Sequence, residues 1–239
     1  MKLTKILAIS FLMGLVGIGY FLEGKKAGKT AFAPHSTEVS PGVYQVVSEN
    51  DDMRIIVATW KPGQKDDWHS HPAFAAYFLT NVDGKLHYPD GTSRDIKAAA
   101  GKSMAMMKDP SHIFENMSDK ECQILLVELK RSDYPTAFKE AAPHSTAVSA
   151  DVYKVITEND DMRVILATWD PGKRDQFHSH PAFAVYFLTD TDARLHHPDG
   201  TIKNIKGKAG HSMVMNADAS HAFENMSENQ VRMVIVEAK

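Results

Sequence analysis

The stretch GQKDDWHSH at residues 63–71 returns as GKRDQFHSH at residues 172–180, and the chain is organised around this repeat. Extending outward from it, residues 33–130 pair without a gap with residues 142–239, at roughly six identities in ten. A gapless repeat of this length indicates two domains of one fold, each large enough to bury its own core. We therefore predict domains at 33–130 and 142–239, joined by a short polar linker at 131–141.

Both repeats have the pattern of a β protein. Short segments rich in Val, Ile, Phe and Tyr, such as 43–48, 53–61 and 74–80, are separated by turn sequences such as Pro89-Asp90-Gly91. No stretch after residue 32 keeps a helical hydrophobic period over three turns. Many short strands at spacings of about ten residues are typical of a β sandwich or barrel. The sequence therefore predicts an all-β protein.

Each repeat carries a His-x-His pair and a third histidine farther along the chain. On a strand, residues i and i+2 project to the same face, so each pair directs two imidazoles into one space. The third histidine follows at the same interval in both copies. Imidazole is a good ligand for Fe, Ni, Cu and Zn ions, so each set of three predicts a metal site. The predicted ligands are His69, His71 and His112 in the first repeat and His178, His180 and His221 in the second.

The same histidines carry a family resemblance. Gly63-x5-His69-x-His71 resembles the first cupin motif, G-x5-H-x-H-x3,4-E-x6-G, and the spacing from Gly101 through His112 to Asn116 is similar to that of the second motif. The second repeat has both motifs, so residues 33–239 resemble a bicupin. The resemblance implies two tandem jelly-roll β-barrels, each with a metal inside. Local strings such as His69-Ser70-His71-Pro72 are most similar to small single-domain cupins of β-alanine degradation.

The chain departs from the cupin pattern at the carboxylate ligand. The glutamate of the motif falls at Ala75 or Ala76 in the first repeat, and at Ala184 or Val185 in the second. Neither side chain binds metal, so the expected ligand set is three neutral histidines with open positions. Loss of a hard oxygen ligand favours a divalent transition metal such as Fe, Ni, Cu or Zn over Mn. Loss of the metal from one or both barrels is the alternative.

Four further residues are candidates for supporting roles. Asp67 has the strand parity of His69 and is expected to orient a ligand histidine through its side chain, whereas its counterpart Gln176 offers only a neutral amide. His87 and His196 precede the Pro-Asp-Gly turns and could project into a pocket. The histidines expected at the surface are His35, His144, His197 and His211.

The N-terminus has the pattern of a targeting segment. Met1–Lys5 is short and basic, and the next seventeen residues, 6–22, carry no charge and form a hydrophobic helix in the predicted fold. Residues 1–32 are either a cleaved signal peptide or a membrane anchor, since 6–22 is just long enough to span a bilayer. In both cases we expect an extracytoplasmic protein, periplasmic or secreted, that meets a membrane only through this segment.

Composition narrows the classes of function. The net charge is −3, and both repeats are mildly acidic, so no basic stripe predicts nucleic acid as a partner. The single cysteine, Cys122, excludes a disulfide framework and a Cys-rich zinc module. The sequence predicts an exported metal-binding bicupin that acts on a small molecule, with dioxygenase-type oxidation the leading chemistry. The alternatives are a non-catalytic binding protein for a metal or small ligand, and a structural module with vacant sites.

Overall fold

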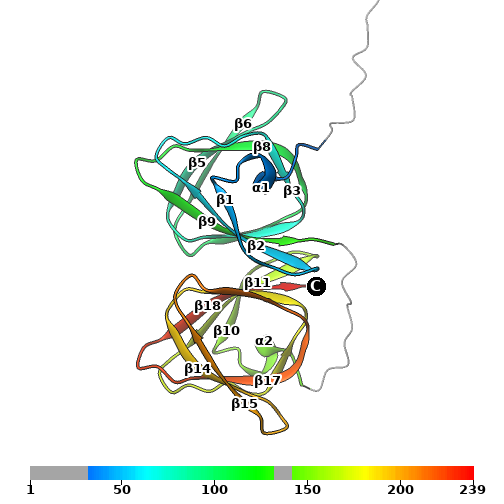
Figure 1. Cartoon of the computed structure of the whole chain (residues 1–239), viewed down its shortest axis with the longest axis vertical. Helices are drawn as coiled ribbons and strands as arrows, with labels where there is room; N and C mark the ends of the chain where they lie inside the picture. The colour runs from blue at the N-terminus through cyan, green and yellow to red at the C-terminus, as the bar shows by residue number, and fades with distance from the viewer. Residues whose placement is uncertain (1–31, 132–141) are drawn as a thin grey trace, which may run out of the picture. The chain divides into compact units, whose positions relative to one another are not determined.

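The computed structural model describes residues 32–131 and 142–239, which form two β-barrels, one per repeat (Figure 1). Each barrel combines a five-stranded and a four-stranded antiparallel sheet and begins with a helix of one turn. The prediction of an all-β protein with two tandem barrels is confirmed. The N-terminal hydrophobic segment 6–22 and most of the predicted linker 131–141 lie outside the described residues.

The elements repeat in the same order in both barrels. The first barrel contains α1 (Ser36–Val39), β1 (Tyr44–Glu49), β2 (Met53–Trp60), β3 (His69–His71), β4 (Phe74–Phe78), β5 (Val82–His87), β6 (Ser93–Ala98), β7 (Ser103–Met106), β8 (Asp109–Asn116) and β9 (Cys122–Leu129). The second contains α2 (Ser145–Val148), β10 (Tyr153–Glu158), β11 (Met162–Trp169), β12 (His178–His180), β13 (Phe183–Phe187), β14 (Thr191–His196), β15 (Ile202–Gly207), β16 (Ser212–Met215), β17 (Asp218–Asn225) and β18 (Val231–Ala238).

Every sheet is built from strands of a single repeat. In the first barrel the strand orders are β1-β2-β9-β4-β7 and β3-β8-β5-β6, and the second barrel has the equivalent orders β10-β11-β18-β13-β16 and β12-β17-β14-β15. Neighbouring strands are often far apart in sequence, because β2 pairs with β9 and β3 pairs with β8. The fold therefore brings the His-x-His strand next to the strand that carries the third histidine.

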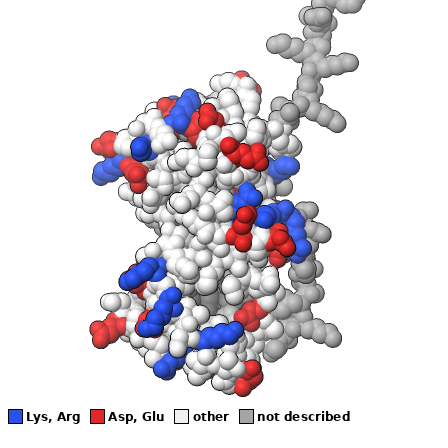
Figure 2. Space-filling view, in the orientation of Figure 1, with Lys and Arg blue, Asp and Glu red and all other residues white. Residues whose placement is uncertain are grey.

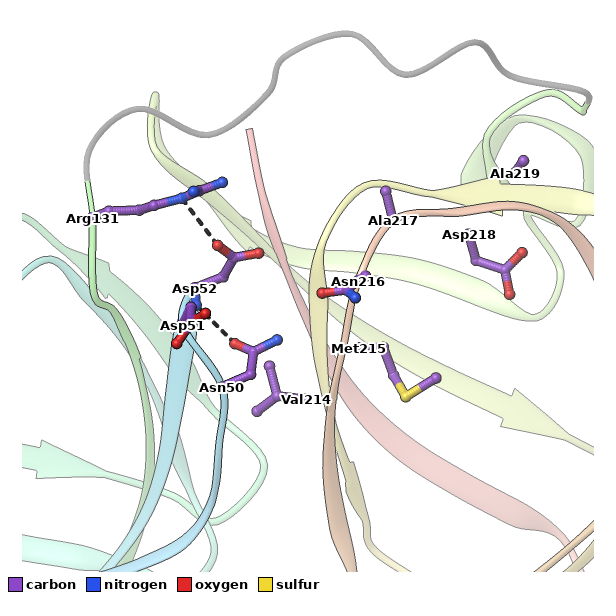
Figure 3. Close-up of a pocket in the computed structure, with 10 residues that line it drawn as sticks. All are labelled: Asn50, Asp51, Asp52, Arg131, Val214, Met215, Asn216, Ala217, Asp218 and Ala219. Carbon is purple, nitrogen blue, oxygen red and sulfur yellow. Dashed lines mark hydrogen bonds and ion pairs between the residues drawn. The ribbon is translucent and has the colours of Figure 1, made fainter.

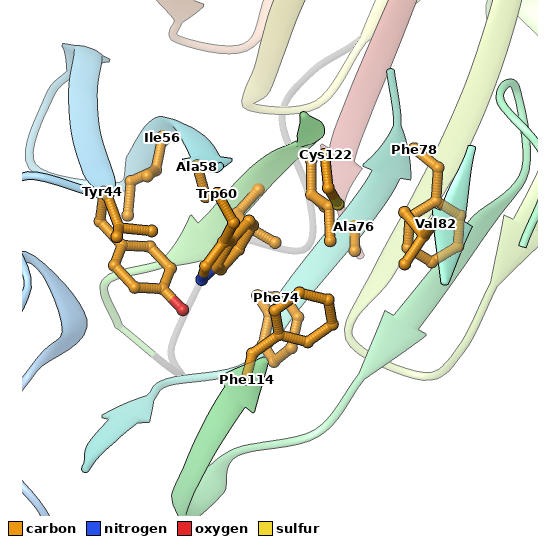
Figure 4. Packing of buried hydrophobic residues seen from close by; sticks show 13 residues of the cluster. Tyr44, Ile56, Ala58, Trp60, Phe74, Ala76, Phe78, Val82, Phe114 and Cys122 are labelled. Carbon is orange, nitrogen blue, oxygen red and sulfur yellow. The ribbon is translucent and has the colours of Figure 1, made fainter. Parts of the chain in front are cut away.

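The core of the first barrel is packed around aromatic rings (Figure 4). The rings of Trp60 and Phe114 lie 4.6 Å apart, and Tyr44 meets Trp60 edge-on at 5.4 Å. Each large side chain buried in this way contributes about 1.5–3 kcal/mol relative to its exposed state. The barrel interior is thus a packed core at one end, and it leaves a cavity beside the histidines.

A second apolar cluster draws on both barrels. Met53 and Ile55 of β2 and Met162 and Val164 of β11 are fully buried in it. The hydroxyl groups of Ser103 and Thr157 also lie within hydrogen-bond distance, at 2.7 Å. The five-stranded sheets are covered on both faces. The sequence of β2 is therefore a nearly continuous run of apolar residues and does not strictly alternate between apolar and polar ones.

Membrane and charge features of the described residues are modest. Within 32–131 and 142–239, no helix is long and apolar enough to cross a membrane. Acidic and basic side chains are intermixed on the face drawn in Figure 2. Many of them form local pairs across neighbouring strands, such as Lys97 with Asp83 and Lys206 with Asp192.

Asn116 joins the end of β8 to two loops. Its side-chain amide donates to the main-chain carbonyls of Trp60, Lys61 and Lys120 at 2.8–3.1 Å. Its carbonyl oxygen accepts from the main chain and the hydroxyl of Ser118. The residue is fully buried and its bond to the Trp60 carbonyl lies in the interior, so that carbonyl has no water to replace the donor.

We expect Asn116→Ala to lower the free energy of unfolding by about 2–3 kcal/mol, because buried carbonyls would lose their donor. Urea titration followed by tryptophan fluorescence measures the change. The control is Asn204→Ala on β15, where the side chain is exposed and the expected effect is below about 0.5 kcal/mol. Equal effects of the two substitutions would contradict this account of Asn116.

Candidate metal centre

The three predicted ligands of each barrel converge in its interior. Both histidines of β3 are buried although they belong to a strand of only three residues. The antiparallel pairing of β3 with β8 places His112 opposite His69. In each set, the candidate ligand atoms lie within 4.8 Å of one another. The structure therefore brings the six predicted ligands together as two triads: His69, His71 and His112, and His178, His180 and His221.

Each histidine of the first triad is held through its Nδ1 atom. His69 Nδ1 donates to the main-chain carbonyl of Asp67 at 2.8 Å, and His71 Nδ1 donates to the Glu128 carboxylate at 2.7 Å. His112 Nδ1 lies 2.9 Å from a carboxylate oxygen of Asp109, outside hydrogen-bond angles. A proton on Nδ1 leaves Nε2 with its lone pair, which is the form that binds a metal.

The second triad repeats these contacts. His178 Nδ1 donates to the carbonyl of Gln176 at 2.7 Å, and His180 Nδ1 donates to Glu237 at 2.6 Å. Here His221 Nδ1 forms a well-aligned hydrogen bond with Asp218 at 2.8 Å. This bond is the main cause that lowers the pKa of Asp218 to about 2. Five of the six triad histidines thus have a hydrogen-bond partner that selects their tautomer, and His112 is the exception.

Burial keeps the His-x-His pair of each triad neutral, because it lowers the pKa of His69, His71, His178 and His180. Burial, together with the neighbouring His112 and His71, lowers the pKa of His69 to about 3. Burial and the other two triad histidines likewise lower the pKa of His178 to about 3. A neutral imidazole at physiological pH has a free lone pair, so the ligand atoms need not lose a proton before they bind an ion.

A buried carboxylate supports each triad from behind. Burial alone would raise the pKa of Glu128, but hydrogen bonds from His35 and His71 hold it at about 2. Arg54 lies 3.8 Å from the same carboxylate. Glu237 has the equivalent contacts with His144 and His180 in the second barrel, and its pKa is also held at about 2. Both carboxylates are therefore negative beside neutral ligands.

A phenol and a second buried carboxylate complete the first centre. The Tyr44 hydroxyl donates to Asp66 at 2.8 Å and lies 3.0 Å from Nε2 of His69. Asp66 also accepts from the Trp60 indole and from the main-chain N–H of Phe114. Burial and Asp66 raise the pKa of Tyr44 well above its ordinary value, so Tyr44 remains a phenol. Tyr153 and Asp175 repeat the pair.

The donor set fits a divalent cation. Three imidazole nitrogens converge, and the carboxylates of Asp66, Asp109 and Glu128 surround them. A cation at the triad would offset part of this negative charge, and histidines whose second nitrogen is held by a carboxylate or carbonyl are the usual arrangement at protein metal sites. The residues present are thus suited to an ion of the class predicted from the sequence.

The four other candidates do not take the supporting roles that were expected from the sequence. Asp67 contacts His69 through its main-chain carbonyl, while its carboxylate accepts from Ser40 at 3.4 Å. The carbonyl of Gln176 makes the same contact, so the charge difference between the two side chains does not reach the ligands. His87 and His196 pair with Glu115 and Glu224 at 2.7 and 2.8 Å, outside the triads.

Several residues of the centre were not predicted from the sequence. The expectation that His35 lies at the surface is wrong, because its side chain is only 20% exposed, caps α1 and donates to Glu128 at 2.8 Å. His144 is equivalent in the second barrel. Glu128 is 57 residues from His71, so no local motif links the two. Most residues are the same in both repeats, so the presence of Glu128 and His35 in both copies does not indicate a role at the centre. Only the strand pairing reveals them.

The first triad opens into a cavity of about 380 Å³ inside the barrel. His71, His112 and Tyr44 line one end of it, and Ala76, where the cupin motif has its glutamate, forms part of the wall. A larger hollow of about 740 Å³ lies where Asn50–Asp52 and Arg131 face residues 214–219 (Figure 3). That hollow contacts the second centre only through Asp218, so we place the ligand cavity inside the barrel.

Comparison with known proteins identifies the fold. No family model and no curated protein sequence matches the chain. The structure is similar to Bacillus subtilis oxalate decarboxylase at pH 4.6, with 14% identity, a TM-score of 0.58, and coverage of 78% of this chain and 68% of that chain. It is also similar to the formate complex of Lactobacillus farciminis oxalate decarboxylase, with 16% identity, a TM-score of 0.55, and coverage of 79% and 77%.

The chain therefore has the fold of two tandem cupin barrels. It is similar in addition to AerE from Microcystis aeruginosa, with 11% identity, a TM-score of 0.57, and coverage of 87% of this chain and 99% of that chain. Identities this low establish a shared architecture and no shared chemistry. The finer likeness to cupins of β-alanine degradation stays a prediction.

We expect the metal-free bicupin to lose stability as the pH falls from about 6.5. Both His69 and His178 have an ordinary pKa of 6.5 and a folded value of about 3, so the unfolded chain takes up protons first. Their contribution is complete above pH 6.5 and is lost as the pH falls through 3. Glu128 and Glu237, with 4.5 ordinarily and about 2 in the fold, add a further loss below pH 4.5.

Thermal unfolding of chelator-treated protein at pH 7.5, 5.5 and 4 measures this dependence. In the double variant His69→Gln, His178→Gln the drop between pH 7.5 and 5.5 should shrink, because two of the titrating groups are gone. A midpoint that does not change over that interval in the unsubstituted protein would contradict the buried neutral state of these histidines.

Proposed function

We propose that this chain is an exported, metal-dependent bicupin that carries out dioxygenase-type oxidation of a small molecule. The observation that supports this best is the buried triad of histidines, of which His71 and His112 line a cavity inside the barrel. Three protein ligands leave coordination positions open, as catalytic metal sites do. The cavity excludes bulk water from the same place.

The proposed metal is a divalent Fe, Ni, Cu or Zn ion. Such an ion, when bound, supplies Lewis acidity and, for a redox-active metal, electron exchange with dioxygen. Mn(II) centres are described for Bacillus subtilis oxalate decarboxylase. In this chain Ala76 stands where the cupin motif has a glutamate, so the ligands are all nitrogens, which favours the softer metals over Mn.

The surrounding residues have distinct roles in this proposal. Glu128 and Asp109 hold His71 and His112 from behind and fix which nitrogen faces the centre. Tyr44 keeps its proton, donates it to Asp66 and lies 3.0 Å from His69 Nε2, so it can orient a substrate only by accepting a hydrogen bond. The apolar wall around Ala76 and Phe74 desolvates the bound molecule.

A non-catalytic binding protein for a metal or small ligand is the second candidate. This alternative is supported by the hydrogen bond of Tyr44, because its hydroxyl proton is already donated to Asp66. Asp66 in turn accepts two further hydrogen bonds, so this pair is poorly placed to shuttle a proton. Oxygen uptake with small-molecule substrates separates the two candidates, because a binding protein would show none above the metal-free chain.

Export is proposed from the sequence of the N-terminal segment. The basic start and the uncharged run at 6–22 support an extracytoplasmic location, periplasmic or secreted, with the segment either removed or retained as an anchor. The acidic balance of both repeats supports a small-molecule partner rather than nucleic acid.

The chain loaded with metal and then desalted is expected to hold about two equivalents of a transition metal, one per triad. The double variant His69→Ala, His71→Ala should hold about one, and removal of all six triad histidines should leave nearly none. Elemental analysis measures the content, with His87→Ala, His196→Ala as the control that keeps both triads. Metal content no higher in the unsubstituted chain than in the six-histidine variant would exclude metal-dependent function.

Glu128→Gln is expected to weaken metal binding at the first triad by about 10–100-fold, because His71 loses a charged partner on Nδ1. Glu237→Gln should do the same at the second triad. Asp67→Asn is the control and should leave the affinity unchanged, since only the main-chain carbonyl of residue 67 contacts His69. Chelator competition measures each affinity, and a large effect of Asp67→Asn would contradict the assignment.

A further inference from the structure

An arginine stands at the mouth of the cavity in the first barrel. Arg94 lies on β6 directly opposite Leu86 of β5, and both line the cavity. Ile96 and Ala98 follow at two-residue intervals and pack against the core of the barrel, so Arg94 has the parity of the inward face of the strand. Arg94 is itself exposed to solvent, so the guanidinium is at the opening rather than in the core.

The charge of Arg94 is not neutralised by a neighbouring side chain. The other charged residues of these two strands pair with one another, Lys97 with Asp83 at 2.9 Å and Lys85 with Asp95 at 3.5 Å. Among the described residues that line the cavity, Arg94 is the cation without an ion pair. A free guanidinium offers a planar pair of donors suited to a carboxylate.

A phenol lies beside this arginine. Tyr88 lies two residues beyond Leu86, which pairs with Arg94, and Tyr88, Arg94 and Asp109 all line the cavity. Burial and the carboxylate of Asp109 raise the pKa of Tyr88, and Arg94 lowers it. Tyr88 also lines the cavity and keeps its proton at neutral pH. The mouth therefore offers one positive charge and one neutral donor, with the negative charge of Asp109 held next to His112. Such a balance suits a monoanion better than a dianion.

The space between the mouth and the triad is apolar. Its volume of about 380 Å³ is in the range of small-molecule sites. The walls include Phe74, Phe78, Leu86, Met104, Met106 and Leu126. The cavity thus has a cation at one end, the candidate metal ligands at the other, and a hydrophobic passage between them.

The two barrels differ in this passage. A Cβ at Gly84 would overlap the ring of Phe114, so the glycine gives that ring room to lie back against β5. The equivalent residue in the second barrel is Ala193, and the exchange is reversed at Ala98 and Gly207, where Phe187 lies within 2.5 Å of the absent Cβ. Arg94 is also replaced by Lys203 in the second barrel. The two interiors therefore differ in the residues that pack beside Phe114 and Phe187, and the two barrels differ in the cation at this position of the strand.

We propose that the first barrel binds a small monocarboxylic acid with an apolar body. The carboxylate pairs with Arg94 at the mouth, with Tyr88 as a second donor, and the apolar body lies along the passage with its far end at the triad. Binding in this orientation is independent of the metal, whereas oxidation of the far end rests on the proposed function.

Calorimetry on the full chain tests this with 3-phenylpropanoate and its amide as probes. The acid should bind at least 10-fold more tightly than the amide. Arg94→Met should weaken the acid by about 10–100-fold and leave the amide unchanged. Gly84→Ala should weaken both probes by pushing Phe114 into the passage, and Ala193 shows that the fold accepts alanine at this position.

Two substitutions that remove the same charge elsewhere serve as controls. Lys97→Met lies on β6 but pairs with Asp83, and Lys203→Met is the equivalent of Arg94 in the second barrel. Neither should change the affinity for the acid. Equal affinities for acid and amide, no binding of either probe, or an undiminished affinity in Arg94→Met would overturn the proposal.

Repeating the titration on chelator-treated protein separates this proposal from the proposed function. Arg94-dependent binding that persists without metal supports the carboxylate site whatever the triads hold. Binding that disappears with the metal and ignores Arg94 overturns it, because the acid would then be a metal ligand. If the chain holds two equivalents of metal but binds acid and amide equally, the metal-dependent function is retained and the carboxylate site is overturned.

Discussion

The buried carboxylate behind each triad is the constraint on which the rest of the centre depends. Glu128 is 1% exposed and remains ionised because two histidines donate to it and Arg54 lies nearby. An ionised group at this depth is costly unless it is paired, so it dictates the tautomer of His71 and draws His35 and the first helical turn onto the barrel. The consequence is that Nε2 of His71 keeps its lone pair.

The repeat preserved this support while it altered the interior. Both barrels keep the carbonyl and glutamate contacts of their triads, and they differ in the aspartate contact, which is a hydrogen bond only in the second barrel. The differences lie at the cavity walls and mouth, where Gly84 exchanges with Ala193 and Arg94 with Lys203. Two similar centres with different surrounding side chains can receive different molecules.

Much of the fold and the triads could be predicted from the sequence. The i, i+2 spacing of His69 and His71 sets both rings on one face of any strand, and the turn sequences separate strands at regular intervals. The roles of Asp67 and His35 could not be predicted in the same way. Asp67 acts through its main-chain carbonyl, which every residue has, so the identity of its side chain gives no indication of the contact. His35 caps a helix and is expected at the surface unless its partner Glu128, 93 residues away, is known.

The sequence by itself determined that the chain has two equivalent β domains, each with three histidines suited to a metal, because periodicity and duplication are local properties of the chain. Only the tertiary structure decided which groups hold those histidines and what lies before them. Antiparallel pairing of β3 with β8 and of β2 with β9 brings together residues separated by tens of positions. Burial then converts their proximity into shifted pKa values, fixed tautomers and a cavity, and no spacing rule along the chain encodes that environment.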